Sequence, residues 1–271
     1  MKKFIFLIAI LVALPSFAQV SKFRYQPEKI EVGTVYHYTK SNLDDTTPEY
    51  VTIFVAAKDR LEVYKTQDPG TRAGLVIATM DWSNFMAKEL ESWAVTGVNA
   101  KTLTAKMTYL PSEKVAAVDL PAAQRPPEKT AIKFLPFHVY NFDLTSLNFA
   151  MRHLIQPQAG FTIGLADPNF AQEGPLFFYR GEVDVIFAGE EQHNGVLCRK
   201  YKIDGEALNN KGGFIWVNKA KEYFEEAQLQ LPDNPNWQSL KLVLTKVEKM
   251  TPAQWKSFMD AHFVSAPAQT Q

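Results

Sequence analysis

Cysteine is almost absent from this sequence, which limits how the chain can be held together. The single cysteine among 271 residues is Cys198, so no disulfide can form within the chain and the fold must depend on its apolar core. Cys198 lies in the alternating segment VLCRKYKI, which favours a small buried hydrophobe inside a strand over a reactive thiol. No cysteine lies near the N-terminus to carry a lipid, so we do not expect a lipoprotein.

Local catalytic and metal-binding motifs are also missing. The five histidines show none of the HxH, HxxxH or HExxH spacings, and there is neither a G-x-S-x-G elbow nor a glycine-rich phosphate loop after a strand. The carboxylate pairs Asp44–Asp45 and Glu190–Glu191 fall in turn-like sequence, where we interpret them as solvated loop charges. A calcium site built from Asp44, Asp45 and Glu49 is an alternative, although EF-hand spacing is absent. We therefore expect no catalytic residue, no metal site and no cofactor.

Neither sign of charge is in excess. Lysine and arginine total 29 and aspartate and glutamate also total 29; without Lys2 and Lys3, which belong to a predicted leader, 27 basic residues face 29 acidic ones, a net charge of −2. This balance gives no electrostatic reason to expect nucleic acid or an anionic membrane as the main partner. An uncharged or amphipathic partner remains open.

Residues 1–18 have the pattern of a secretory signal peptide. Lys2 and Lys3 form a basic start, Phe4–Leu14 an apolar core, and Ser16–Ala18 a small-x-small cleavage site before Gln19. The apolar run of about eleven residues is shorter than the roughly 20 that a helix needs to span a bilayer. We therefore predict export to the periplasm and no transmembrane segment after cleavage.

Most of the remaining sequence alternates with the period of two that is typical of half-buried strands. In segment 81–95, a helical stripe that includes Phe85 and Leu90 competes with continued strand pairing, and we favour a strand. The other predicted strands cover residues 32–40, 50–57, 61–65, 73–79, 101–109, 115–120, 177–188, 196–204, 214–217, 223–231 and 239–249.

A helix is predicted in segment 142–165, between two blocks of strands. Asp143 is the expected N-cap, and Pro157 and Gly160 are expected to end the helix. Because so short a helix is marginal alone, we expect its apolar stripe to pack on the sheet. That stripe consists of Leu144, Leu147, Ala150, Met151 and Leu154, and it leaves Asn148, Arg152 and His153 facing water.

A second helix is predicted at the C-terminal end. Thr251, Pro252 and Gln254 match an N-cap, a proline at the first helical position and the partner in a capping box. Trp255, Phe258 and Met259 form its apolar face.

These elements predict a mainly β protein with a large curved antiparallel sheet or half-open barrel, one central helix and a C-terminal helix. The proline-rich segment 121–136 is the best candidate for a boundary. We favour a single β-rich domain over residues 19–263, with two halves, 32–120 and 137–263, as the alternative. Residues 264–271 are expected to be a disordered tail.

Part of the sequence resembles a family of secreted bacterial domains of unknown function, in which a D-x-x-S-L-x-(F/Y)-A-x-R-x-L helix precedes a glycine-containing turn and long antiparallel strands. The residues that carry this likeness are Asp143, Ser146, Leu147, Phe149, Ala150, Arg152, Leu154 and Gly160, followed by Gly181, Gly195, Tyr201 and Trp216. The long hairpins of the first half are more distantly similar to lipoprotein-carrier proteins. That likeness implies a half-open barrel whose concave face holds acyl chains or another apolar ligand, and neither family supplies catalytic residues.

Aromatic residues are abundant, with 19 Phe, 10 Tyr and 5 Trp. Core packing accounts for most of them, but one concave face could instead line a ligand cavity. Our first hypothesis is a non-enzymatic periplasmic protein that binds a lipid or other apolar ligand. The alternatives are an envelope scaffold that binds another envelope protein or a glycan, and a hydrolase whose dispersed site involves His37 or His153. Candidate ligand-binding residues are Tyr36, Phe54, Trp82, Trp93, Tyr201 and Trp216.

Overall fold

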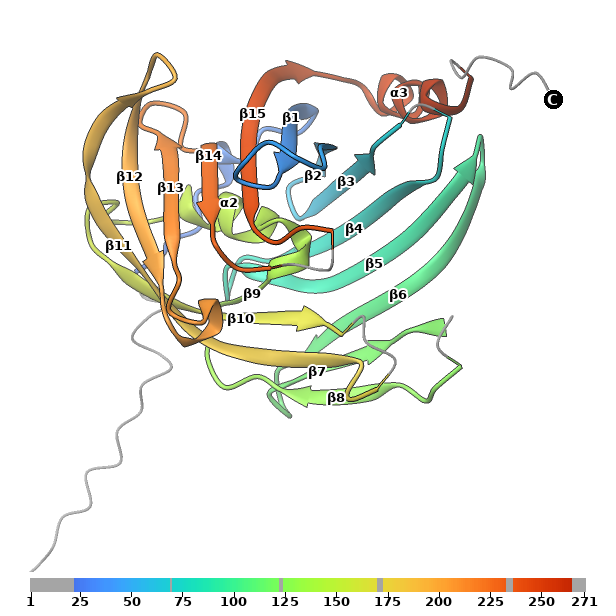
Figure 1. The fold of residues 1–271 in the computed structure, drawn as a ribbon, viewed down its shortest axis with the longest axis horizontal. Helices are drawn as coiled ribbons and strands as arrows, with labels where there is room; N and C mark the ends of the chain where they lie inside the picture. Colours follow the sequence, from blue (N-terminus) through green and yellow to red (C-terminus); the bar gives the residue numbers. More distant parts are fainter. Residues whose placement is uncertain (1–21, 69, 122–123, 170–172, 233–235, 265–271) are drawn as a thin grey trace, which may run out of the picture.

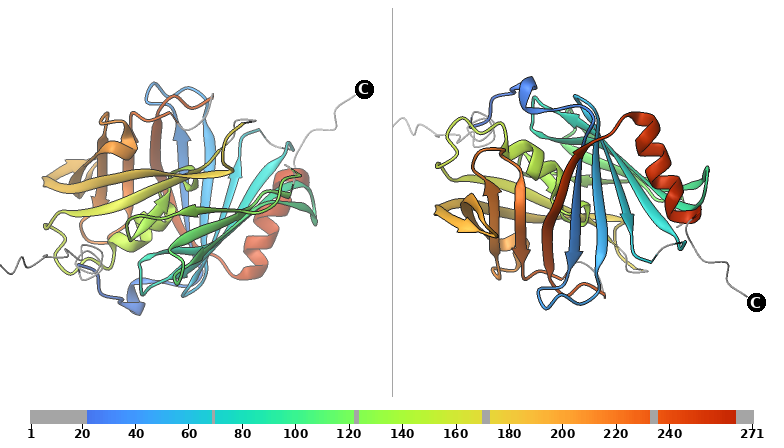
Figure 2. Two further views of the ribbon diagram at one scale, coloured as in Figure 1. Left: turned by 90° about the horizontal axis from the view of Figure 1, so that it is seen from below. Right: turned by 90° about the horizontal axis from the view of Figure 1, so that it is seen from above.

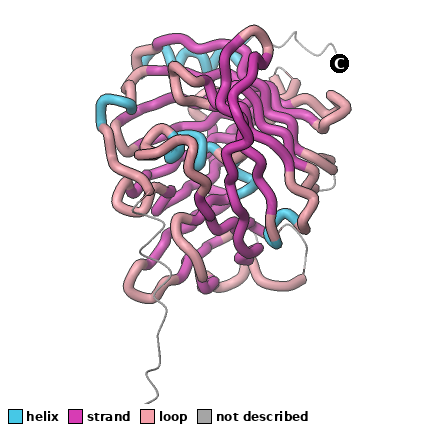
Figure 3. The backbone as a smooth tube through the Cα atoms, turned by 90° about the vertical axis from the view of Figure 1, so that its left-hand side faces the viewer, coloured by secondary structure: helices cyan, strands magenta, loops and turns pink. Residues whose placement is uncertain are grey.

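Strands dominate the computed structural model, which describes residues 22–68, 70–121, 124–169, 173–232 and 236–264 (Figures 1 and 3). Over these residues, fifteen strands form one curved sheet, and two α-helices lie on its opposite faces. The strands are β1 (Thr34–Ser41), β2 (Glu49–Ala57), β3 (Arg60–Thr66), β4 (Ala73–Asp81), β5 (Met86–Gly97), β6 (Ala100–Leu110), β7 (Val115–Asp119), β8 (Glu128–Ala131), β9 (Phe137–Val139), β10 (Phe161–Pro168), β11 (Phe177–His193), β12 (Val196–Asp204), β13 (Gly213–Asn218), β14 (Phe224–Leu229) and β15 (Leu240–Lys249).

The order of the strands explains how distant parts of the chain meet. From one edge to the other the sheet runs from β8 down to β1, then from β15 down to β9, so β1 and β15 pair near its middle. Neighbouring strands are antiparallel except β9 and β10, which are parallel. The predicted mainly β fold with a large curved sheet is therefore confirmed, and both halves of the chain contribute to the same sheet.

The sheet curls without closing into a barrel over the described residues. Register shifts, for example between His37 and Tyr38 and between Ser92 and Trp93, bend the strands locally. Near the open side, β8 is connected to β11 and to the residue before it by side-chain hydrogen bonds and not by a backbone ladder. The Thr130 hydroxyl donates a hydrogen bond to the Phe177 carbonyl at 2.8 Å, and the Leu176 amide donates one to the Glu128 carboxylate, also at 2.8 Å.

The central helix α2 (Thr145–Met151) lies inside the curve of the sheet, and every one of its residues is buried (Figure 1). It follows the 3₁₀ turn η3 (Tyr140–Phe142) and ends well before Pro157, so the predicted extent was wrong. The predicted N-cap was also wrong. Asp143 has a left-handed φ of 52°, Leu144 takes the N-cap position without a side-chain cap, and the Asp143 carboxylate binds lysines instead.

The prediction that Asn148, Arg152 and His153 face water was wrong as well. Their exposed fractions are 1%, 2% and 0%. Periodicity assumes that only one face of a helix is buried, whereas here the sheet encloses α2 and the N-terminal segment covers its end. The Arg24 amide donates a hydrogen bond to the His153 carbonyl at 2.8 Å, and Phe23 forms an isolated bridge with Leu154.

The second helix, α3 (Pro252–Val264), lies on the outer face of the sheet (Figure 2). Its predicted capping box is confirmed: the Thr251 amide donates to Gln254 Oε1 at 2.8 Å, and the Gln254 amide donates to Thr251 Oγ1 at 3.3 Å. Trp255 is buried, stacks on Phe54 and donates from its indole nitrogen to Glu62 at 2.8 Å. We call the buried residues at the contact between this helix and the sheet the outer cluster; they are Val35, Phe54, Tyr64, Ala73, Leu75 and Trp255.

Most predicted strands are confirmed, including the strand favoured within 81–95, which forms β5 after a turn. The sequence analysis missed β8, β9 and β10, which lie in or beyond the proline-rich segment. The predicted signal peptide lies outside the described residues, as does the predicted tail apart from Val264. None of the described helices has the length and apolar character needed to span a bilayer.

Candidate functional site

A cleft of about 540 Å³ opens on the concave face of the sheet, near its open side. Strands β4 to β7 form one wall, and η3 with β9 to β11 forms the other. The walls are largely apolar and continue into the main core. The lining residues are Arg72, Val76, Leu90, Ser92, Thr104, Ala105, Lys106, Met107, Val118, Leu120, Val139, Asn141, Phe142, Pro168, Asn169 and Phe177.

Strand alternation and one pair of small residues explain why the cleft is hollow. Leu90, Met107 and Val118 are register partners on β5, β6 and β7, and all three are buried on the concave face. Beside them, Ser92 on β5 lies opposite Ala105 on β6. Because neither side chain is large enough to reach the opposite wall, the space above this pair stays open.

A buried charge cluster holds the wall segment η3 against the sheet. Asp143, which follows the cleft residue Phe142, lies 2.8 Å from Lys40 Nζ and 2.5 Å from Lys65 Nζ. Burial alone would raise the pKa of Asp143, but the positive charges and hydrogen bonds of Lys40 and Lys65 hold it below its usual value. The cluster therefore stays ionised and ties the η3–α2 connection to β1 and β3.

A second ion pair fixes the neighbouring strand β10. Arg180 Nη2 lies 2.7 Å from Asp167 Oδ2, and the other oxygen of that carboxylate accepts a hydrogen bond from the Asn141 amide at 2.8 Å. Lys65 Nζ donates to the Asn141 carbonyl at 2.9 Å. The backbone at this rim of the cleft is thus fixed by charged groups that are already paired with one another.

One serine and one histidine meet inside the core. His138 Nδ1 lies 2.8 Å from Ser146 Oγ, and both residues have an exposed fraction of 1%. Burial lowers the pKa of His138 to about 3, and its Nε2 makes no hydrogen bond to the described residues. A substrate in solvent has no access to this pair, so we interpret it as a packing contact of α2.

The two histidines named in the hydrolase alternative lie far from the cleft. His153 is buried against Tyr25 and Trp82, and burial, followed by the charges of Arg152 and Lys29, lowers its pKa to about 3. His37 is on the outer face, where Nε2 lies 2.8 Å from Glu248 and Nδ1 lies 3.4 Å from Thr52 Oγ1. It borders a separate hollow of about 460 Å³ beside α3.

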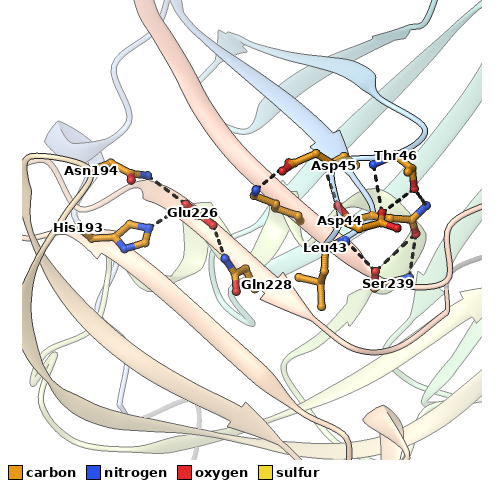
Figure 4. A network of polar contacts seen from close by, with 12 residues as sticks. Leu43, Asp44, Asp45, Thr46, His193, Asn194, Glu226, Gln228 and Ser239 are labelled. Atoms are coloured by element: carbon orange, nitrogen blue, oxygen red, sulfur yellow. Dashed lines mark hydrogen bonds and ion pairs between the residues drawn. The ribbon is translucent and has the colours of Figure 1, made fainter.

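Figure 4 shows two polar networks, one around Glu226 on β14 and one in the turn between β1 and β2. In both, the carboxylates already have polar partners within the protein. Glu226 accepts hydrogen bonds from His193 at 2.8 Å and Asn194 at 3.1 Å. In the turn proposed above as a calcium site, Asp44 accepts from Thr46 at 2.6 Å and Asp45 pairs with Lys241 at 2.7 Å. Over the part of the chain that the structure describes, no three His, Cys, Asp or Glu side chains are grouped to hold a metal ion.

Three of the six predicted ligand-binding aromatics face the core or cover α2. Tyr36 packs edge-on against Phe149 with ring centroids 5.8 Å apart. Tyr201 is buried and donates a hydrogen bond to the Pro157 carbonyl at 2.6 Å. Trp82 stacks on Tyr25 at the N-terminal segment. These contacts are internal to the protein.

The other three aromatics lie on the outer face. Phe54 is under α3, and Trp93 packs against the same outer cluster with Lys101 Nζ 4.5 Å from its ring. Trp216 stacks on His193 at 4.2 Å and donates to Glu191 at 2.7 Å. The structure therefore does not bring the six residues together, and none of them lines the cleft.

Comparisons with solved structures give alignments at low sequence identity. No family model and no curated protein matches the chain. A DUF1329 family protein from Desulfovibrio piger aligns at 10% identity over 83% of this chain and 89% of its own, with a TM-score of 0.26. A putative outer membrane lipoprotein-sorting protein domain from Vibrio parahaemolyticus aligns at 10% identity over 84% of this chain and 91% of its own, with a TM-score of 0.22. The helix motif from Asp143 to Leu154 stays a prediction.

Proposed function

We propose that this is an exported, non-enzymatic protein that binds one apolar or amphipathic ligand, of the size of a lipid acyl chain, in the cleft on the concave face of its sheet. The observation that carries the proposal is the cleft itself, with its apolar walls and a volume of about 540 Å³. Small-molecule sites in proteins are commonly apolar hollows of roughly 300–1,000 Å³ with a few polar groups at the rim.

The chemistry of the walls favours an aliphatic ligand. Leu90, Met107, Val118 and Leu120 offer flexible or branched aliphatic surface, and the described lining has one aromatic residue from η3 and one from β11. Burial of an acyl chain on such a surface contributes about 0.8 kcal/mol for each methylene group removed from water. Such a ligand needs no specific polar groups along its aliphatic chain.

The scaffold supports binding because its walls are already formed. Hydrogen-bonded ladders hold β4 to β7, and the Asp143 cluster and the Asp167–Arg180 ion pair hold the opposite wall. A ligand therefore does not have to order the protein when it binds, which lowers the free-energy cost of association.

A fluorescent probe titration tests the proposal. N-phenyl-1-naphthylamine, added to detergent-free protein, is expected to saturate one site. Replacement of Leu120 by Trp adds bulk at a half-buried cleft position outside the strands, and we expect it to weaken probe binding at least tenfold. The matched control is Val98→Trp, in the exposed β5–β6 turn, which should bind like the wild type.

Two results would contradict the proposal: no saturable probe binding by the wild type, or equal binding by Leu120→Trp and Val98→Trp while both remain folded by circular dichroism. The first would favour the scaffold alternative. For that function, the exposed outer-face side chains Ile186 and Phe214, which flank Lys202 in register, would be the first residues to test.

A further inference from the structure

One basic side chain lies on the concave face at the edge of the cleft. Ala73 and Leu75 belong to the outer cluster under α3, so the alternation of β4 turns Val76 to the opposite face. Arg72 directly precedes β4. Val76 packs against the main core, and both Arg72 and Val76 line the cleft. Arg72 is exposed, so it places a guanidinium group where the apolar wall meets solvent.

This guanidinium has no competing partner among the described residues. Arg72 makes no ion pair or side-chain hydrogen bond to any of them, and the described lining of the cleft contains no Asp or Glu. Two acidic residues close to the cleft are held by other cations, Asp143 by two lysines and Asp167 by Arg180. Among the described lining residues at the mouth of the cleft, Arg72 is therefore a positive charge with no carboxylate beside it in the lining.

Lys106, the other basic lining residue, points away. Its neighbour Met107 is buried on the concave face, so the Lys106 side chain projects from the outer face. There its ammonium lies 3.5 Å from Glu91 Oε1. Arg72 is thus the basic side chain that a ligand in the cleft would meet.

We infer, resting on the proposed function, that Arg72 binds the anionic headgroup of the ligand, so that the preferred occupant is an aliphatic chain that ends in a carboxylate or a phosphate. An arginine at the boundary of an apolar cleft suits such a molecule, because its planar guanidinium donates two parallel hydrogen bonds to either group. The chain of the ligand fills the apolar hollow while its head remains at the solvent edge. A free fatty acid and a phospholipid share this chemistry.

Displacement of the naphthylamine probe by matched neutral and anionic ligands tests this inference. Palmitate is compared with hexadecanol, and palmitoyl lysophosphatidate with monopalmitoylglycerol, on the wild type, Arg72→Gln and the control Lys211→Gln. Lys211 is exposed in the turn before β13, away from the cleft, and its replacement removes the same charge. Comparison of palmitate with palmitoyl lysophosphatidate distinguishes a fatty acid, with its carboxylate, from a phospholipid, with its phosphate.

We expect the wild type to bind at least one anionic ligand three- to tenfold more tightly than its neutral partner, and Arg72→Gln to lose this preference while its affinity for the neutral ligand changes less than twofold. Lys211→Gln should retain the preference, and added salt should reduce it. Equal affinities of neutral and anionic ligands in the wild type, or an undiminished preference in Arg72→Gln, would overturn the inference and leave the proposed function standing. If no ligand displaces the probe from the cleft, both fail.

Discussion

The Asp143 carboxylate lies 2.8 Å from the ammonium of Lys40, and the two side chains have exposed fractions of 0% and 2%. Lys65 contacts the other carboxylate oxygen. Since Asp143 sits between η3 and α2, this contact connects the wall of the cleft and the central helix to strands β1 and β3. The helix inside the curve is thus anchored by charge as well as by apolar packing.

Replacement of Asp143 by Asn is expected to destabilise the protein by about 3–5 kcal/mol, because it leaves two lysines without their shared counter-ion in the interior. Urea unfolding followed by circular dichroism measures the change. The control is Asp260→Asn, which breaks an exposed pair with Lys256 on α3 and should cost about 0.5 kcal/mol or less. Equal effects of the two substitutions would show that the buried cluster does not anchor α2.

Stability should fall on acidification because His138 is buried in its neutral form. Burial lowers its pKa to about 3 in the folded protein, whereas an unfolded histidine takes up a proton near pH 6.5. The contribution of neutral His138 to the free energy of unfolding is therefore complete above about pH 6.5. It is lost as the pH falls toward 3, at about 1.4 kcal/mol per pH unit. His138→Gln should show a shallower dependence of unfolding free energy on pH in this window, with the contribution of His153 remaining. An unchanged slope would contradict the prediction.

Arg152 and Tyr36 should be energetically coupled. The guanidinium is buried, donates one hydrogen bond to the Tyr36 hydroxyl at 2.8 Å and lies 4.0 Å from the Phe149 ring centroid. Tyr36→Phe removes a hydrogen bond to a buried charge and should cost about 2 kcal/mol. An Arg152→Met background lacks the buried positive charge. There, Tyr36→Phe should lower the free energy of unfolding by less than about 1 kcal/mol. A double-mutant cycle measures the difference, and additivity of the two substitutions would refute the coupling.

Cys198 should react slowly with thiol reagents while the protein is folded. It is buried on β12, and burial, followed by the negative charges of Glu225 and Glu191, raises the pKa of its thiol to about 11. At pH 8 the thiolate is scarce and shielded, so we expect little reaction with Ellman's reagent until urea is added. Stoichiometric reaction of the native protein within seconds would disprove this account of the thiol.

Local patterns in the sequence predicted much of the fold. Strand alternation depends on neighbouring residues, and so does the capping box of Thr251 and Gln254, and both are confirmed. The role of Asp143 could not be found in this way, because its partners Lys40 and Lys65 lie far away in the sequence. An acidic residue before a helix resembles an N-cap until long-range pairing is known.

The cleft was the least predictable feature. The sequence analysis looked for aromatic residues, but aromatics here serve both the core and the outer cluster, as Tyr36 and Phe54 show. The hollow arises from the small cross-strand pair Ser92 and Ala105, and a small pair is visible only once strand register is known. Two Ser or Ala residues on successive strands, flanked by larger apolar residues, are the signal that could have indicated it.

Native mass spectrometry is the most direct test of a ligand-binding cleft. Protein purified without detergent is mixed with palmitate, and its mass is compared with that of Leu120→Trp treated in the same way. The account predicts one added ligand mass on the wild type, extractable by organic solvent, and a largely bare Leu120→Trp. A bare wild-type protein under these conditions, or equal loading of the two proteins, would contradict it.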